Sequence, residues 1–263
     1  MKKALVLGKT GRLGRALGRY WAANEPCFTP VWMGRREAEG ELPAAQAVLA
    51  LWGRTAGDAE TLAENAELAE RAAGLAEKAG AGRVLHLSSA AVYGGGAGPH
   101  READALAPRG AYGAAKCEME ARIARLGGAR HCILRLANVA GADSLFRALD
   151  TRDEIVLDRF EGGGGPVRSY IAIPELAQVV EALLACEAAR LPQVLNVAAP
   201  APVAMEEIAR AAGRRIVWRE AGAEAVPRVV LDTARLESLV SLGPQASDAA
   251  HLVDSWQRYG AGA

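Results

Sequence analysis

Three glycines near the N-terminus constrain the fold of this chain more than any other feature. Gly8, Gly11 and Gly14 follow the short apolar run 4–7 at intervals of three residues, and they open a segment with helical spacing, 13–23. Glycine permits a tight turn and a close approach of the backbone to a ligand, and the free N–H groups of a helix N-terminus attract negative charge. The pattern therefore predicts a strand, a phosphate-binding turn and a helix, as in dinucleotide-binding domains. A simple turn without a ligand is the alternative.

The rest of the chain alternates short β-rich apolar runs with segments of helical periodicity. Asp58 is placed to cap the longest of these helices. Such alternation predicts an α/β fold with a doubly wound parallel sheet of the Rossmann type, joined by right-handed crossovers. The predicted strands are 4–7, 28–33, 47–52, 84–87 (ending in Ser88 and Ser89), 131–136 and 194–197, and the main predicted helices are 13–23, 58–78, 112–126 and 174–189.

The alternation loosens after Gly141, where the run EGGGGP at 161–166 predicts a flexible loop. A length of 263 residues suits one large α/β domain with a small appended lobe. We expect residues 1–140, rejoined by about 171–198, to form the dinucleotide-binding domain. Residues 141–170 and 199–263 are expected to form a small C-terminal substrate lobe.

Charge and composition narrow the class of partner. The chain has 31 basic and 31 acidic side chains, which argues against nucleic acid or an anionic membrane as its partner. No apolar stretch reaches the ~18 residues of a membrane-spanning helix. The four cysteines and four histidines show no metal-ligand spacing, so we expect no metal site. We expect buried thiols, a cytoplasmic location and a small-molecule substrate.

The end of the second predicted strand bears on the choice of cofactor. An NAD site usually has a carboxylate there, which accepts a hydrogen bond from the ribose 2′-OH. Here Gly34 is followed by Arg35 and Arg36, whose guanidinium groups suit the 2′-phosphate of NADP. The sequence favours NADP over NAD on this ground, and a solvated surface pair with Glu37 is the alternative interpretation.

Other residues are expected to contact the cofactor. Thr10, Arg12 and Leu13 lie between the glycines of the turn. Trp52 ends the third predicted strand and could line the cofactor site, although ordinary core packing explains it equally well.

A serine, a tyrosine and a lysine together predict hydride-transfer chemistry. Tyr112 and Lys116 are four residues apart and share one face of a helix, downstream of the strand-end Ser89. A nearby ammonium favours the phenolate, so we expect Lys116 and a nicotinamide ring to lower the phenol pKa from ~10. Tyr112 would then exchange a proton with a substrate oxygen that Ser89 holds by a hydrogen bond. A surface helix pair is the alternative for the Tyr–Lys spacing alone.

In the same order along nearly the whole chain, several motifs resemble the extended short-chain dehydrogenase/reductase family of NAD(P)-dependent sugar-nucleotide epimerases and dehydratases. They are GKTGRLG, LSSAAVYGG, YGAAK, LRLANVAG, RSYIAIPELA and LNVAAPAPVAMEEIARAAG. The resemblance implies that Ser89, Tyr112 and Lys116 form the catalytic triad, with Ser88 as the weaker alternative for the serine. It also implies that Lys116 holds the nicotinamide ribose.

The same resemblance extends to the substrate and to assembly. It implies that Asn138 and Arg168 bind a nucleotide-sugar substrate through its sugar or diphosphate. It also implies a homodimer formed through a helix bundle that includes the helix of Tyr112.

The chain departs from this family pattern at three places. Residues 33–47 are too few for the further helix and strand that a usual member has there, so we expect the sheet to lack that edge unit. Residues 141–168 are few as well, which predicts a small or open substrate lobe. Dehydratases of the family carry an Asp-Glu pair just after the serine, where this chain has Ala90 and Ala91, so dehydration ranks low.

The sequence therefore predicts an NADP-dependent oxidoreductase that acts on a carbonyl or secondary alcohol of a sugar or nucleotide sugar. Two alternatives stay open. One is an epimerase that retains NAD(P) through its cycle. The other is a non-catalytic NADP(H)-binding regulator, which would need the glycine turn but not the proton donor.

Overall fold

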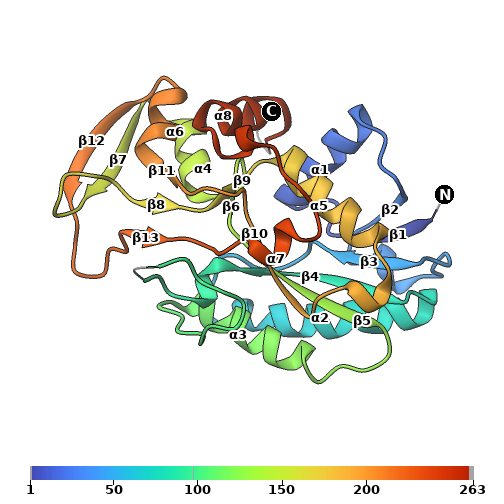
Figure 1. The fold of residues 1–263 in the computed structure, drawn as a ribbon. Coiled ribbons are helices and arrows are strands. Elements are labelled where there is room, and N and C mark those ends of the chain that lie inside the picture. Colours follow the sequence, from blue (N-terminus) through green and yellow to red (C-terminus); the bar gives the residue numbers. More distant parts are fainter. Residues whose placement is uncertain (1, 97, 261–263) are drawn as a thin grey trace.

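A six-stranded parallel sheet organises the computed structural model, which describes residues 2–96 and 98–260 (Figure 1). Its strand order is β10-β5-β4-β3-β1-β2, which confirms the predicted α/β doubly wound sheet. All six predicted strands are present, with ends that differ by two residues or fewer. They are β1 (Lys3–Leu7), β2 (Thr29–Met33), β3 (Ala47–Ala50), β4 (Arg83–Ser89), β5 (Arg130–Leu136) and β10 (Val194–Val197).

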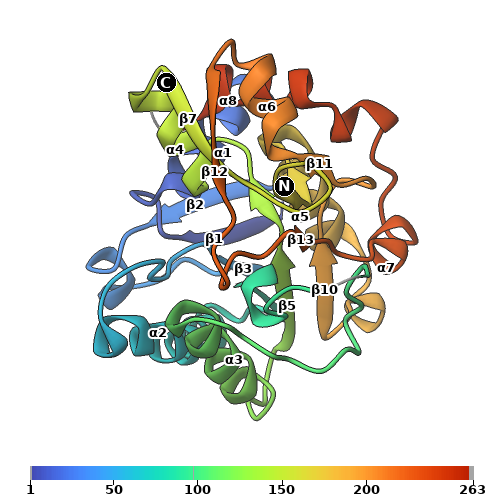
Figure 2. The same ribbon diagram turned by 90° about the vertical axis from the view of Figure 1, so that its left-hand side faces the viewer.

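Helices cover both faces of this sheet, because its strands are apolar on both sides. Helices α1 (Arg12–Ala23) and α5 (Ile173–Ala185) lie on one face, and α2 (Ala59–Ala79) and α3 (Ala111–Ile123) on the other (Figures 1 and 2). Asp58 caps α2 as predicted, since its side chain accepts a hydrogen bond from the Thr61 N–H at 2.9 Å. Strand β1 lies between β2 and β3, so the direction of winding reverses there, and ligands of such sheets bind at the carboxyl ends of these strands.

Strand β2 forms one edge of the sheet. Between β2 and β3 the chain forms only the short 3₁₀ helix η1 (Glu37–Glu39). The predicted loss of an edge unit is therefore confirmed.

Helix α5 ends at Ala185, four residues before the predicted end. Arg83, at the start of β4, donates hydrogen bonds from Nη1 to the carbonyl oxygens of Leu183 (2.9 Å) and Cys186 (2.6 Å). These carbonyls lie at the helix C-terminus, where no intrahelical partner is available. A long-range contact thus ends the helix, and the local sequence did not reveal it.

A second buried cluster lies beyond the sheet and contains Phe146, Leu149, Leu157, Ile208 and Leu252. It is enclosed by α4 (Ser144–Thr151), β7 (Glu154–Arg159), α6 (Met205–Ala211), β12 (Arg215–Glu220) and α8 (Ala249–Tyr259). The predicted loop at 161–166 connects β7 to β8 (Val167–Arg168). The remaining elements are η2 (Ala90–Val92), β6 (Asn138–Val139), β9 (Tyr170–Ile171), η3 (Ala188–Arg190), β11 (Val203–Ala204), β13 (Arg228–Val229), α7 (Ala234–Glu237) and η4 (Pro244–Ser247).

Three further features concern residues 2–96 and 98–260. None of their helices combines the length and apolar character needed to cross a bilayer. Within the same residues, no group of three or more His, Cys, Asp or Glu side chains is arranged to hold a metal ion. All four cysteines are free, and Cys132 is buried, but the prediction of buried thiols is wrong for Cys27, which is exposed.

Candidate active site

The glycine turn between β1 and α1 is packed so closely that positions 8 and 14 have no room for a Cβ atom. Gly8 has φ of 103°, and a Cβ there would lie 2.8 Å from the backbone nitrogen of Trp52. A Cβ on Gly14 would overlap the carbonyl oxygen of Gly8. No side chain caps the N-terminus of α1, and no acidic residue lies in its first turn. The turn therefore fits the pyrophosphate of a dinucleotide, which backbone N–H groups can bind.

The other predicted turn residues differ in exposure. Thr10 and Arg12 are exposed, whereas Leu13 is half-buried against the core below α1. Arg12 also reaches the segment between β6 and α4, where its Nη1 lies 3.4 Å from the carbonyl oxygen of Ala142.

A carboxylate lies beside the glycine turn at the end of β2. Glu37 accepts hydrogen bonds from Lys9 Nζ and from the backbone N–H of Gly34, and the bond from Lys9 is the main cause that lowers the pKa of this carboxyl. The sequence analysis treated Glu37 only as a possible surface partner of the arginines. The missed signal was an acidic residue four positions beyond the strand.

The two arginines predicted to bind a 2′-phosphate differ in their surroundings. Arg35 donates from Nη1 to Glu64 at 3.2 Å, and Glu64 is also bound by Arg54 at 2.9 Å. Arg36 is exposed on the surface. The guanidinium of Arg35 is thus held against α2.

The structure brings Ser89, Tyr112 and Lys116 together. Ser89 ends β4, and Tyr112 and Lys116 lie on the first two turns of α3. Gly113 allows α3 to pack closely on the turn after Ser89, because a Cβ there would lie 2.6 Å from the carbonyl oxygen of Ala91. The Ser89 hydroxyl lies beside the Tyr112 phenol and accepts a hydrogen bond from the Ala91 N–H at 3.2 Å, and Lys116 Nζ donates to the carbonyl oxygen of Leu87 at 2.8 Å.

The protonation of Tyr112 and Lys116 depends mainly on their burial. Burial raises the pKa of Tyr112, although the hydrogen bond with Ser89 opposes the shift. Burial also lowers the pKa of Lys116 to about 8, against the opposite effect of Glu120. Lys116 Nζ lies 6.0 Å from the centre of the Tyr112 ring. The chain by itself therefore does not lower the phenol pKa, mainly because the phenol is buried, and the fall expected with a nicotinamide ring bound stays a prediction.

Residues 51–53, which follow β3, connect the glycine turn to Lys116. The backbone of Trp52 packs against Gly8, and a Cβ on Gly53 would lie 3.6 Å from Lys116 Nζ. Asn65 on α2 fixes the end of this segment: it is 1% exposed, and its amide exchanges hydrogen bonds with Arg54 N (3.1 Å) and O (3.0 Å). Sequence analysis missed Asn65, because one polar residue in a long helix gives no signal.

The side chain of Trp52 does not line the cofactor site as predicted. It is 8% exposed, and its Nε1 donates to the carbonyl oxygen of Leu68 on α2 at 3.1 Å. The indole packs in the core, which was the alternative interpretation. Only its backbone takes part in the site, through the contact with Gly8.

Ser88 is directed away from Tyr112. It is buried, and its Oγ donates to Glu120 at 2.5 Å. This contact favours Ser89 as the serine of the site.

The two residues predicted to bind substrate lie on the short strands β6 and β8. Asn138 is half-buried beside the hydroxyl of Tyr170, which donates to Asp143 Oδ2 at 3.1 Å. Arg168 donates from Nη2 to the carbonyl oxygen of Val226 at 2.7 Å and from Nη1 to that of Pro227 at 3.2 Å. Its guanidinium therefore links β8 to the segment before β13, and a role in diphosphate binding stays a prediction.

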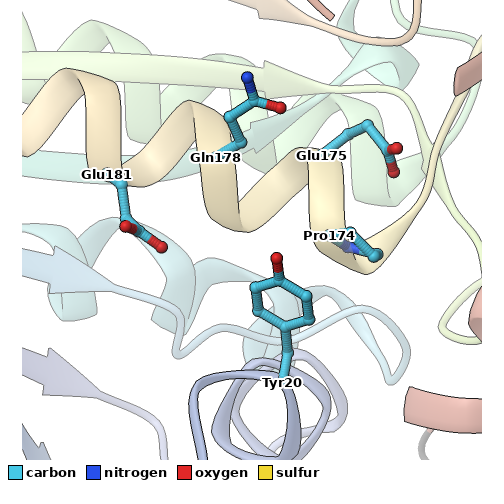
Figure 3. Close-up of a pocket in the computed structure, with 5 residues that line it drawn as sticks. All are labelled: Tyr20, Pro174, Glu175, Gln178 and Glu181. Carbon is cyan, nitrogen blue, oxygen red and sulfur yellow. The ribbon is translucent and has the colours of Figure 1, made fainter. Parts of the chain in front are cut away.

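A cavity of about 260 Å³ lies between α1 and α5, apart from the residues described above (Figure 3). Tyr20 points its hydroxyl toward α5, which contributes Glu175, Gln178 and Glu181 to the lining (Figure 3). Glu181 is occupied by structural contacts, because it accepts hydrogen bonds from Trp21 Nε1 (3.0 Å) and Cys27 N (3.1 Å). The cavity contains none of the predicted site residues.

Comparisons with known proteins bear on the family of the chain and on its fold. Residues 44–198, more than half of the chain, match the NAD dependent epimerase/dehydratase family. No curated protein matches the sequence. The fold resembles that of TunA, described as an NAD dependent NDP-hexosamine 5,6-dehydratase involved in tunicamycin biosynthesis, at 20% identity over 100% of both chains with a TM-score of 0.78.

Two further solved structures share the fold but are described as catalysing other reactions. One is a dTDP-4-dehydrorhamnose reductase from Clostridium acetobutylicum, at 19% identity over 97% of this chain and 98% of that one, with a TM-score of 0.74. The other is a UDP-galactose 4-epimerase, at 20% identity over 97% of this chain and 98% of that one, with a TM-score of 0.71. Identities this low show the fold alone, so the reaction must be argued from the site.

Proposed function

We propose that this chain, which belongs to the NAD dependent epimerase/dehydratase family, transfers hydride at a carbonyl or secondary alcohol carbon of a nucleotide sugar. One observation carries the proposal: Ser89, Tyr112 and Lys116 meet at the carboxyl end of β4, and Lys116 is linked through residues 51–53 to the glycine turn. A regulator that only binds the cofactor would have no use for Ser89 and Tyr112 in this arrangement.

Each residue has a distinct task in this proposal. A bound nicotinamide dinucleotide would supply or accept the hydride. The glycine turn and the N-terminus of α1 bind its pyrophosphate, and Lys116 binds its nicotinamide ribose. Tyr112 donates a proton to the substrate oxygen during reduction and removes it during oxidation. Ser89 donates a hydrogen bond to the same oxygen and so stabilises the charge that develops on it.

Among the reactions of the family, net oxidoreduction is the one we favour, and epimerisation with retained cofactor is the alternative. Ala90 and Ala91 stand where the resemblance implies an Asp-Glu pair in dehydratases, so the chain has no acid–base pair there for eliminating water. The reductase and the epimerase with the same fold are described as acting on dTDP- and UDP-linked sugars. We propose residues 141–170 and 199–263 as the substrate lobe, with Asn138 and Arg168 at its junction with the sheet domain.

A substrate screen tests this proposal. NADH and NADPH oxidation would be followed with UDP- and dTDP-linked keto sugars, and NAD⁺ and NADP⁺ reduction with the corresponding alcohols. NMR analysis of the sugar products detects epimerisation without net change in the cofactor. Turnover of a keto sugar supports the proposal, and an epimerised product with unchanged cofactor favours the alternative. Tight cofactor binding without any turnover would favour the non-catalytic regulator.

Cofactor preference is tested at Glu37. Its carboxylate lies beside the glycine turn and would repel a 2′-phosphate, so we propose NAD(H) as the preferred cofactor, with NADP(H) as the alternative predicted from Arg35 and Arg36. Glu37→Gln should shift the ratio of NADH to NADPH affinity by about threefold to fivefold toward NADPH, the range expected for one exposed charge. Binding titrations with both cofactors measure this ratio.

Glu39→Gln is the matched control for this change. Glu39 lies on the same 3₁₀ helix, and its carboxylate pairs with Arg71 of α2 at 3.3 Å, whereas that of Glu37 pairs with Lys9 in the glycine turn. Wild-type protein that binds NADPH more tightly than NADH would overturn the preference for NAD(H). Equal shifts in the two variants would show that Glu37 does not face the ribose.

A further inference from the structure

Helix α3 presents three polar side chains to β4 along one face. Glu120 follows Lys116 by four residues and Tyr112 by eight, so the three lie one above another. Lys116 Nζ donates to the carbonyl oxygen of Leu87, Glu120 binds Ser88, and the Tyr112 phenol lies beside Ser89. The contact of Glu120 is the short hydrogen bond from Ser88 Oγ to Glu120 Oε1, at 2.5 Å. Helix α3 and the end of β4, which carry the proposed triad, are thus in contact at each of the strand residues 87–89.

Glu120 is itself bound by Arg135 of β5. Arg135 Nη2 donates to Glu120 Oε2 at 2.7 Å, and its Nε lies 3.2 Å from both carboxylate oxygens. Both side chains are only 6% exposed. The remaining donor of the guanidinium, Nη1, reaches the hydroxyl of Tyr93 (2.8 Å) and the carbonyl oxygen of Glu102 (3.0 Å). A buried ion pair whose other hydrogen bonds are satisfied in this way holds one geometry.

We propose that Glu120 is a positioning residue of the hydride-transfer site: anchored by Arg135, it holds Ser88 and thereby keeps residues 87–89 in register with Tyr112 and Lys116. The catalytic part of this inference rests on the proposed function. A displacement of about 1 Å at a reacting group can cost on the order of 100-fold in rate. Loss of the Glu120–Ser88 contact moves the neighbouring Ser89 hydroxyl and the carbonyl that Lys116 binds.

Glu120 also determines the electrostatic surroundings of Lys116. From β4, His86 faces this lysine, but burial lowers the pKa of His86 to about 3 and keeps it neutral. The Tyr112 phenol on α3 is neutral because burial raises its pKa. The segment after β3 contributes Gly53, which carries no charge. Glu120 supplies the negative charge that opposes the fall in the pKa of Lys116.

The experiment compares Ser88→Ala, Glu120→Gln and the control Tyr93→Phe. Ser88→Ala removes the contact with Glu120 and leaves the Glu120–Arg135 pair intact, so it is expected to fold even if Glu120→Gln, which leaves Arg135 unpaired, does not. Tyr93→Phe removes two hydrogen bonds from the same buried network, with Arg135 and Asn196, but none of the contacts between α3 and β4. Thermal unfolding shows how far each variant is destabilised.

The first measurement is turnover of a substrate found in the screen. Ser88→Ala should lower kcat by roughly 10- to 100-fold with little change in cofactor affinity. Ser88→Thr, which retains the hydroxyl, should restore most of the loss, and Tyr93→Phe should retain wild-type kcat. Equal losses in Ser88→Ala and Tyr93→Phe, or no loss in Ser88→Ala, would show that the network only stabilises the fold and would overturn the proposal.

The second measurement does not require a substrate. The chain has only five lysines, at 2, 3, 9, 78 and 116, so ¹³C-lysine NMR gives few side-chain signals, and Lys116→Arg assigns that of Lys116. We expect this signal to titrate near pH 8 in the wild type and at lower pH in Glu120→Gln. At fixed pH it should be displaced in Ser88→Ala and unchanged in Tyr93→Phe. If no substrate turns over, only the proposed function fails. If the Lys116 signal is unmoved in both Ser88→Ala and Glu120→Gln, the positioning role is overturned.

Discussion

Replacing Tyr112 with phenylalanine should lower kcat by about 10²- to 10⁴-fold and leave cofactor binding near the wild-type value. The phenol is the proposed proton donor, and in the structure it lies beside the Ser89 hydroxyl at the end of β4. Phenylalanine retains the ring and its packing, so the change removes only the group that exchanges the proton. Steady-state kinetics on a substrate from the screen, together with NADH titration, measure both effects.

Tyr20→Phe is the matched control for this variant. The hydroxyl of Tyr20 lies at the cavity between α1 and α5 (Figure 3). These helices cover the face of the sheet opposite to α3, which carries Tyr112 and Lys116 (Figure 1). Its removal should leave kcat unchanged. Full activity in Tyr112→Phe would show that another group donates the proton.

The second large effect is expected at Gly14, the last glycine of the turn. A Cβ there would overlap the carbonyl oxygen of Gly8, and neither backbone segment can move aside without opening the turn. Gly14→Ala should therefore cost about 1–3 kcal/mol of stability, as overpacking does in protein cores. It should also weaken NADH binding by about 100-fold or more, because the N-terminus of α1 is displaced from the pyrophosphate. Thermal unfolding and cofactor titration separate the two effects.

Gly18→Ala provides the control on the same helix. A Cβ at Gly18 would lie 3.7 Å from the ring of Trp32, an ordinary packing distance. Alanine favours the helix over glycine, so this variant should be as stable as the wild type or more so, with unchanged NADH affinity. If Gly14→Ala bound NADH as tightly as Gly18→Ala, the turn would not be the pyrophosphate site.

The sheet was predictable from sequence because its signals are local. Each strand is a short apolar run, α1 has a clear helical periodicity, and α2 begins at its cap, Asp58. The end of α5 was not predictable, because it depends on Arg83, which lies about a hundred residues earlier in the chain. Elements that end through local turn chemistry can be inferred, whereas an end imposed by a distant side chain cannot.

The candidate site was predictable in its residue types but not in its electrostatics. The order of the glycine turn, Ser89, Tyr112 and Lys116 identified the residues that come together. The fall in the Tyr112 pKa expected from Lys116 and a nicotinamide ring stays a prediction, because in the chain by itself burial raises that pKa and the ammonium binds the carbonyl oxygen of Leu87. Glu120 continues the same four-residue spacing after Lys116, so its place on that face was a signal that sequence analysis missed.

The buried network around Tyr93 has a consequence for how the protein matures in the cell. The hydroxyl of Tyr93 donates to Asn196 at 2.8 Å, and the amide of Asn196 donates to the carbonyl oxygen of Asp232 at 3.1 Å. The chain emerges from the ribosome N-terminus first, and contacts between such distant residues close late during folding. A nascent chain that ends before residue 232 therefore already carries every group of the proposed triad but lacks the hydrogen bond between Asn196 and Asp232, so this buried network is expected to close only after the triad residues have been synthesised.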